Sequence, residues 1–360
     1  FSGCYSIKRI PNLNTAKVTD MTSMFNSCIN LREAPVLDTA NVTNMSTMFN
    51  SCRRLEKVPL YNTANVTTMS SMFSGCSRLR EIPDFNTSKV TTFTSFAQSC
   101  GSLLKAPNID TANATAFNGM FNSCYLLQAI PVYNTSNVTL MNLTFATCAS
   151  LKKAPNWNTS KVTTMASMFT TCSSLVDVPL YDTANVTSMA SMFSSCSALA
   201  NVPAFNTANV TSMASMFSSC SGLLSVPFFN TAKVTDMSSM FNAATAIKEV
   251  PLFNTANVTL MSNMFNTAQA LRKIPAFDTT KVTTLNSFAA QIPSLTEVPA
   301  SFNTSNCTNF AIMFAGSPGI QRLPAMNLAN ATVTTVFVSD NRITYQTPPI
   351  SDANGISNLK

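Results

Sequence analysis

Ten of the eleven cysteines recur at intervals of 24 residues, from Cys4 to Cys220. Thiols stacked on successive repeats would lie about 4.8 Å apart, which would suit disulfides or a ladder of metal sites. The alternative is a small, buried, apolar side chain. The same position holds Ala244, Ala268 and Ile292 in later repeats, and parallel side chains in register have poor disulfide geometry. We therefore predict buried, unbridged thiols, and neither a metal nor a cofactor.

The residues that catalysis most often needs are absent or scattered. The sequence contains no histidine, which removes the commonest general base, the commonest zinc ligand and any Ser-His or Cys-His nucleophile. Its eight glycines are too scattered for a phosphate-binding loop, and no pair of acidic residues recurs as a glycosidase dyad would. We predict that the protein is not an enzyme.

A polar Asn-x-Thr motif also recurs along the chain. Its asparagine would accept a glycan in a eukaryotic secretory pathway, or it could be a loop residue that serves turn and cap geometry. Lysine takes the same position in the other five repeats, so we expect the position to face solvent; these residues are Lys17, Lys89, Lys161, Lys233 and Lys281. The candidate acceptors are Asn41, Asn65, Asn113, Asn137, Asn185, Asn209, Asn257, Asn306 and Asn330.

These residues are positioned by an internal repeat. Thirteen prolines, from Pro11 to Pro299, are each 24 residues apart, and Pro324 and Pro348 continue the series after one inserted residue. Repeats of this length form solenoids, in which each unit buries a face of its neighbour. We predict one solenoid domain over residues 1–335 and a capping unit with a polar tail over 336–360. Because the chain starts in mid-repeat, we expect any signal peptide or anchor to lie upstream.

Each unit has two apolar segments with different spacing. Leu175-x-x-Val178-Pro179-x-Tyr181 predicts a short strand that ends at the proline, with a core residue two positions after it. The segment from Val186 to Cys196 has apolar residues at offsets of 3, 6, 7 and 10, which predicts a short helix. The fold class is thus an α/β repeat solenoid of about fourteen units, each with a strand, a loop and a short helix. An all-strand β-helix is the alternative.

The unit Asn-Thr-Ala-Asn-Val-Thr-x-Met-x-x-Met-Phe-x-x-Cys-x-x-Leu resembles the repeat of the BspA-like leucine-rich-repeat surface proteins. The match runs from Phe1 to about Thr335. The resemblance implies a cell-surface or virus-associated protein, often adhesive, with no catalytic residues. This chain has proline where that family often has an extended Leu-x-Leu strand.

The composition limits the partners. Charged residues make up only 10% of the chain, and the net charge is +7. No block of basic residues indicates nucleic-acid binding, and no run of 18 apolar residues predicts membrane insertion. We predict an extracellular, cell-surface or virion location, with a protein or glycan on a host or neighbouring surface as partner. Other copies of the chain, in a homo-oligomer or fibre, are the alternative.

The positions just before each proline carry about half of all charges, but the middle repeats are nearly neutral there. Because leucine-rich repeats commonly bind with this face, it is the candidate binding site; an ordinary solvated edge is the alternative. The candidate residues are Val176, Asp177, Ala200, Asn201, Leu224, Ser225, Lys152, Lys153, Lys248, Arg272 and Lys273.

Two weaker patterns complete the analysis. Lys161 and Asp182 are 21 residues apart, and their equivalents recur every 72 residues, so an ion pair across neighbouring repeats is predicted. A threonine column, beginning with Thr15, Thr39 and Thr63, would suit a flat ice-binding array, although any repeat produces such columns. The function hypotheses are therefore adhesion or partner binding and, as the alternative, a structural fibre or virion component that serves as a spacer or self-assembly surface.

Overall fold

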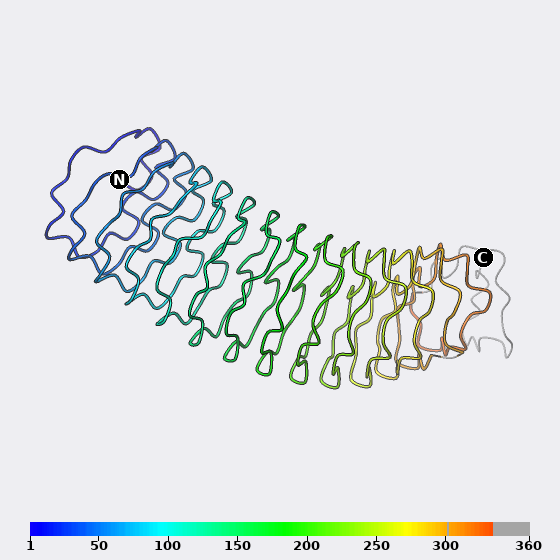
Figure 1. Cartoon of the computed structure of the whole chain (residues 1–360). Helices are drawn as coiled ribbons and strands as arrows, with labels where there is room; N and C mark the ends of the chain where they lie inside the picture. Colours follow the sequence, from blue (N-terminus) through cyan, green and yellow to red (C-terminus); the bar gives the residue numbers. More distant parts are fainter. Residues whose placement is uncertain (301, 334–360) are drawn as a thin grey trace. The chain divides into compact units, whose positions relative to one another are not determined.

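The computed structural model describes residues 1–300 and 302–333. It divides into two compact units, Phe1–Asn185 and Val186–Lys360. Within each unit the chain winds as a stack of similar coils, one for each 24-residue repeat (Figure 1). The solenoid predicted from the proline spacing is present in both units. The predicted cap over residues 336–360 lies outside the described residues.

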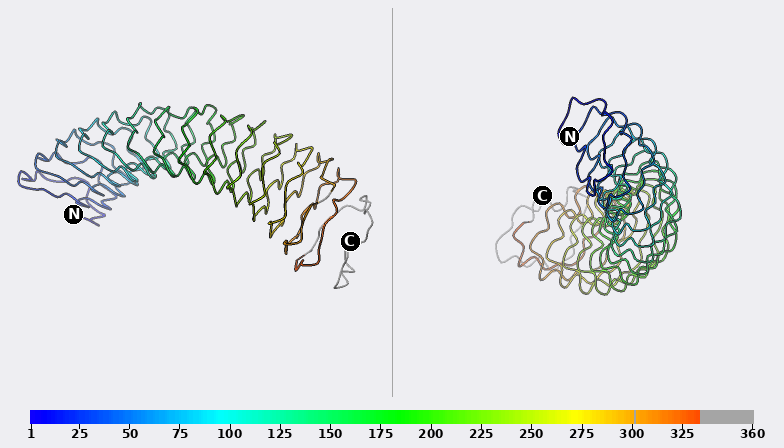
Figure 2. Two further views of the ribbon diagram at one scale, coloured as in Figure 1. Left: turned by 90° about the horizontal axis from the view of Figure 1, so that it is seen from below. Right: turned by 90° about the vertical axis from the view of Figure 1, so that its left-hand side faces the viewer.

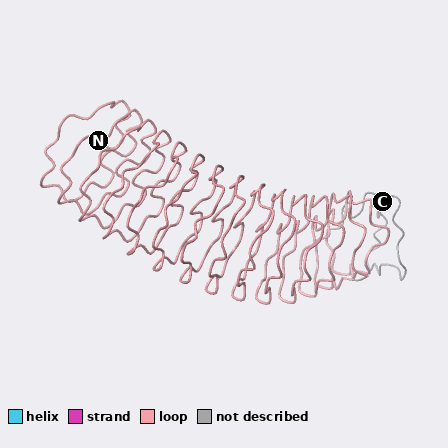
Figure 3. Ribbon diagram, viewed as in Figure 1, coloured by secondary structure: helices cyan, strands magenta, loops and turns pink. Residues whose placement is uncertain are grey.

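Neither unit contains a helix or an extended strand within the described residues (Figure 3). Instead, equivalent residues of adjacent repeats form single-residue parallel β-bridges. In the first unit one row of bridges runs from Asp20 through Asn44 to Thr164, and in the second unit the equivalent row runs from Ser188 through Ser212 to Val333. This row lies at the residue that follows Val-Thr in each repeat, within the segment that was predicted to be helical.

The helix predicted over Val186–Cys196 was wrong, and a chain of tight turns takes its place. The amides of Met192, Ser194 and Cys196 each bond to the carbonyl three residues earlier, at 3.0–3.1 Å. The amides between them point to the next repeat: Phe193 N donates to Met216 O at 3.0 Å. Half of the amide groups therefore close turns and the other half join repeats, whereas a helix would use them all internally.

The turns explain why the sequence imitates a helix. Each closes a loop of four residues, so that the apolar first and fourth residues come back to the same inner face. Ser191 and Ser195 have positive φ angles of 56° and 62° at the third position of their turns, a conformation that no α-helix contains. The resulting apolar spacing of three and four residues matches the helical period, although the backbone is different.

The segment before each proline is narrower than the predicted strand. Its bridges join only single residues, as between Glu33 and Lys57 or between Lys153 and Asp177 in the first unit. In the second unit Lys273 bridges to Glu297. Backbone hydrogen bonding between adjacent repeats is sparse beside the proline column, as expected because proline lacks an N–H group.

Stacked aromatic rings fill the core beside the turns, and the successive coils that carry them are seen from two further sides in Figure 2. In the first unit the rings of Phe49 and Phe73 stack at 5.9 Å. In the second unit Phe217 stacks on Phe241 at 5.8 Å, and Phe229 stacks on Phe253 at 6.3 Å. Phe229 and Phe253 lie two positions after a proline, so the predicted core column is confirmed there; Leu13, at the N-terminal end of that column, is only half-buried.

Candidate functional site

The candidate binding residues lie on the surface of both units. In the first unit, Val176 is 55% exposed although its amide bonds to Lys152 O at 2.9 Å. In the second unit, Leu224 is 57% exposed and Ala200 is half-buried, with the Leu224 amide bonded to Ala200 O. The backbone therefore holds these side chains outward without using them in the core, and their role in binding remains a prediction.

The polar candidates beside them interact mainly with one another. Lys153 Nζ lies 3.4 Å from Asp177 Oδ2 in the first unit, and Lys273 Nζ lies 3.4 Å from Glu297 Oε2 in the second. Ser225 Oγ donates a hydrogen bond to Asn201 Oδ1 at 3.0 Å. The remaining basic candidates, Lys152, Lys248 and Arg272, are exposed.

Sequence analysis missed a second exposed column, which follows each proline. In the first unit four of its residues are large aliphatic side chains that are 67–86% exposed, namely Val36, Leu60, Val132 and Leu180, whereas Asn12, Asp84, Asn108 and Asn156 hold the position in the other repeats. In the second unit Phe228 is 66% exposed and Leu252 is 57% exposed. Alternation was the available signal: the residue two after proline is apolar and in most repeats buried, so the residue one after the proline points outward.

The Asn/Lys position faces solvent, as predicted. In most described copies the asparagine amide donates to a carbonyl of the preceding repeat; Asn41 Nδ2, for example, lies 2.8 Å from Ala16 O. Where lysine follows asparagine, its ammonium group bonds to the asparagine oxygen, as Lys161 Nζ does to Asn137 Oδ1 at 2.8 Å. These bonds form a polar ladder on the surface, and glycosylation of its asparagines remains a prediction.

The predicted ion pair between Lys161 and Asp182 is not among the ion pairs of the described residues. Lys161 bonds to Asn137, one repeat toward the N-terminus, whereas Asp182 lies one repeat toward the C-terminus. The Asp182 carboxylate instead accepts the amide of Ala184, at 3.1 Å. A hydrogen bond within its own loop has thus taken the place of the proposed pair.

The threonine column that begins at Thr15 is buried, so it cannot be an ice-binding array. Thr231 is 1% exposed, and its hydroxyl donates to Asn254 O at 2.7 Å. The same bond joins repeat to repeat along the column within each unit, as at Thr39, whose hydroxyl donates to Asn62 O. The column is internal because its hydroxyls satisfy the carbonyls of the next coil.

The periodic cysteines are buried from Cys28 to Cys220, as predicted, and Cys4 is half-buried. No disulfide joins the cysteines of the described residues. Cys52 Sγ donates to Phe25 O of the preceding repeat at 3.1 Å, and Cys220 Sγ donates to Phe193 O at 2.9 Å. Burial raises the pKa of both thiols to about 12, which keeps them protonated and makes them poor nucleophiles at neutral pH.

The described residues contain no group of three or more cysteine, aspartate or glutamate side chains that could hold a metal ion. Among them there is also no helix of the length and apolar character that a membrane crossing would need.

Coils of this kind, joined by bridges and by buried polar ladders, define a leucine-rich-repeat solenoid. The chain belongs to a family described as "Mycoplasma protein of unknown function, DUF285", whose model matches residues 1–107, 104–201, 151–251, 175–272 and 235–343. No curated protein matches the sequence.

One solved structure supports the same fold, and a second is reported beside it. A leucine-rich repeat protein from Bacteroides ovatus superimposes with a TM-score of 0.52 at 16% identity, over 91% of this chain and 87% of that one. A leucine-rich cell surface protein from Faecalibacterium prausnitzii gives a TM-score of 0.49 at 18% identity, over 79% and 83% of the two chains. The resemblance to the BspA-like leucine-rich-repeat surface proteins, predicted from the repeat, is thus confirmed.

Proposed function

We propose that this chain is a non-enzymatic binding or adhesion module, displayed outside a cell or on a virion, whose partner is a protein or glycan on a host or neighbouring surface. The observation that carries the proposal is the exposed apolar column that follows the prolines. Val132 is 86% exposed and Leu60 is 70% exposed, although the equally large side chains that directly follow them, Tyr133 and Tyr61, are buried. Apolar side chains that recur on one surface suit a macromolecular contact.

The neutral surface before the prolines is the preferred contact within each unit. In the first unit Val176 and Asp177 are both exposed, next to the buried Leu175, and in the second unit Leu224 follows Ala200 in the same column. Removing water from such side chains costs little free energy, whereas the charged residues of other repeats are costly to dehydrate. Within each unit the repeat supplies a surface of regularly spaced side chains, which is typical of repeat proteins that bind other macromolecules.

A binding assay on intact cells tests the proposal. Fluorescently labelled chain should bind saturably to eukaryotic or bacterial cells and should be displaced by unlabelled chain. A denatured sample of the same chain, with its thiols kept reduced, is the control for nonspecific adhesion. Unsaturable binding that the denatured chain reproduces would contradict the adhesion role.

Light scattering after size-exclusion chromatography separates this proposal from the structural alternative. A binding module should elute with the mass of a single chain, 38.7 kDa, over a wide concentration range. Concentration-dependent filaments or large oligomers, together with no cell binding, would favour the fibre or virion component instead.

A further inference from the structure

The first unit carries an arginine patch that begins in the pre-proline column and extends beyond the candidate residues named there. Five of the nine arginines in the sequence fall between residues 32 and 80, within three consecutive repeats. All five are exposed. We define the arginine patch by these residues: Arg32, Arg53, Arg54, Arg78 and Arg80.

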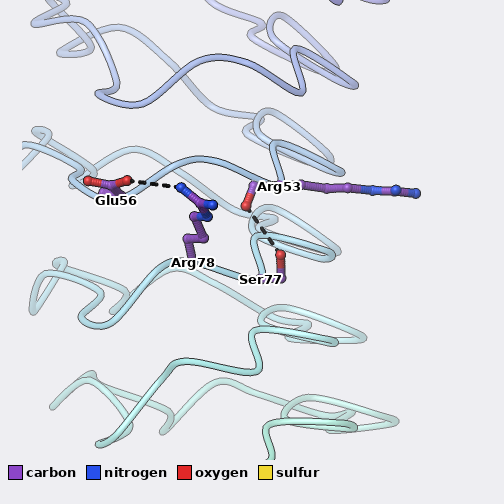
Figure 4. A network of polar contacts seen from close by, with 4 residues as sticks. All are labelled: Arg53, Glu56, Ser77 and Arg78. Carbon is purple, nitrogen blue, oxygen red and sulfur yellow. Dashed lines mark hydrogen bonds and ion pairs between the residues drawn. The ribbon is translucent and has the colours of Figure 1, made fainter.

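Contacts between adjacent repeats bring these arginines together. Ser77 Oγ donates to Arg53 O at 3.2 Å (Figure 4). The next residues, Arg54 and Arg78, are 24 residues apart and hold equivalent positions in neighbouring repeats. The Glu56 amide donates to Arg32 O at 2.8 Å, which fixes the third coil beside them. Adjacent coils lie about 4.8 Å apart. The Arg53 side chain extends away from Arg78, which points toward Glu56, so the guanidinium groups are spread across the exposed edge of these coils (Figure 4).

Carboxylates neutralise only part of this charge. Arg78 Nη1 lies 3.7 Å from Glu56 Oε1, and Lys57 Nζ lies 3.6 Å from Glu33 Oε1. Glu81 is the third carboxylate in these segments. Arg32, Arg53, Arg54 and Arg80 form no ion pair with any described residue, so the surface keeps an excess of positive charge.

We propose that the arginine patch binds a sulfated polysaccharide. Guanidinium groups present paired donors that match the oxygens of sulfate, and they give up water more readily than ammonium groups do. The segments that carry the patch, 29–33, 53–57 and 77–81, contain no exposed large apolar or aromatic side chain. Within these segments an acidic protein would find no apolar anchor and single-stranded nucleic acid no ring on which to stack; the exposed apolar Leu104 adjoins Arg80 from the next coil, so both ligand classes are included as competitors in the test.

The proposal rests on the proposed function, because it names the class of surface molecule that an adhesion module would hold. The arginine patch lies apart in sequence from Val176, so the two can fail independently. If a variant with neutralised patch arginines still binds cells saturably and keeps its full affinity for the sulfated polysaccharide, the adhesion role stands and the role of the arginine patch does not.

Heparin is the probe for the full chain, with binding measured by surface plasmon resonance at several salt concentrations. The triple variant Arg53→Gln, Arg54→Gln, Arg80→Gln should lose about tenfold in affinity, as expected for three exposed charge contacts. Its affinity should also fall less steeply as salt rises, since fewer ions are exchanged on binding. The matched control, Lys161→Gln, Lys233→Gln, Lys281→Gln, removes the same charge from the Asn/Lys ladder and should bind like the parent chain.

Three competitors decide the ligand class. Chemically desulfated heparin, poly-glutamate and single-stranded DNA should each compete at least about tenfold more weakly than heparin, a difference of about 1.4 kcal/mol. Equal loss in the two triple variants, no binding of heparin by the parent chain, or stronger competition by any of the three would overturn the proposal. The unfolding midpoint, followed by fluorescence of the buried Trp157, confirms that each variant is folded.

Discussion

Lys153 and Asp177 form an ion pair of 3.4 Å at the same two residues whose backbones make a parallel bridge. The pairs Glu33–Lys57 and Lys273–Glu297 repeat this coincidence elsewhere in the column. Opposite charges on directly adjacent coils favour this register, because a shift by one residue would separate them. The charged column before the prolines therefore contributes to the alignment of repeats, in addition to any binding role.

A double-mutant cycle on Lys153→Ala and Asp177→Ala measures this contribution. The two side chains are 76% and 60% exposed, so water and salt screen the pair. We expect a coupling of at most about 1 kcal/mol in urea unfolding at low salt, which should shrink further at high salt. A coupling that is large and independent of salt would show that the pair is not solvated as the structure indicates.

The buried threonine column that contains Thr231 should contribute more to stability than the exposed threonine column that contains Thr235. Thr231→Val leaves Asn254 O without its donor, and we expect a loss of about 1–2 kcal/mol in the free energy of unfolding. Thr235, in the same repeat, is exposed, and its hydroxyl makes a longer bond of 3.3 Å to Thr211 O. Thr235→Val is therefore the matched control and should change stability by less than about 0.5 kcal/mol. Equal effects of the two substitutions would contradict the ladder as a stabilising feature.

The repeat, the buried columns and the exposed Asn/Lys position could all be predicted from sequence because each depends on which side chain meets water. Ala244 in place of cysteine and Lys161 in place of asparagine reveal burial and exposure without knowledge of the backbone. The 24-residue spacing already gives Arg32 and Arg80 equivalent positions, but the directions of the arginine side chains could not be inferred in this way, since they depend on the conformation of each coil.

The turn conformation could not be predicted from apolar spacing, because tandem turns and helices both place residues three or four positions apart on the same face. A signal was nevertheless present in the glycines. Gly75 and Gly316 share a column with Ser51 and Ser195, and all four have positive φ angles. A position that alternates between glycine and serine inside an apparent helix therefore indicates a left-handed residue.

Substitutions at a left-handed serine test this conformation. Ser219 has a φ angle of 59°, where a β-branched side chain is strained, so Ser219→Val should cost about 1–2 kcal/mol in the free energy of unfolding. Ser219→Gly should be neutral or stabilising, because glycine adopts this region without strain. Ser221 has no positive φ angle, and Ser221→Gly should destabilise slightly. Thermal unfolding followed by circular dichroism distinguishes the three variants. A Ser219→Val variant more stable than Ser219→Gly would contradict the turn conformation.

The buried thiols should make the protein sensitive to alkaline pH. Burial raises the pKa of Cys52, Cys172 and Cys220 to about 12, whereas thiols of the unfolded chain ionise near pH 8.5–9. Below about pH 8.5 neither state loses these protons, and stability is unaffected. Between about pH 9 and 12 only the unfolded state releases them, so the free energy of unfolding should fall as pH rises.

The triple variant Cys52→Ala, Cys172→Ala, Cys220→Ala should have a shallower decline over this pH range in urea unfolding. Tyr61, Tyr133 and Tyr181 remain in both proteins, and burial also raises their pKa, so some decline persists in the variant. Identical slopes would show that the thiols do not contribute. Mass spectrometry without reductant should find no disulfide between Cys4 and Cys220.

Glutamate substitutions test whether the neutral surface before the prolines belongs to a binding site. Leu224 is 57% exposed and Leu223 is fully buried, so the two neighbours form a matched pair. Leu224→Glu should change the free energy of unfolding by less than about 0.5 kcal/mol, whereas Leu223→Glu should cost about 3 kcal/mol or more, because it buries an unpaired charge. Val176→Glu and Leu175→Glu repeat the comparison in the first unit. If the proposed contact is correct, Leu224→Glu and Val176→Glu weaken saturable cell binding while the protein stays folded. Full cell binding by both folded variants would show that this surface is an ordinary solvated edge.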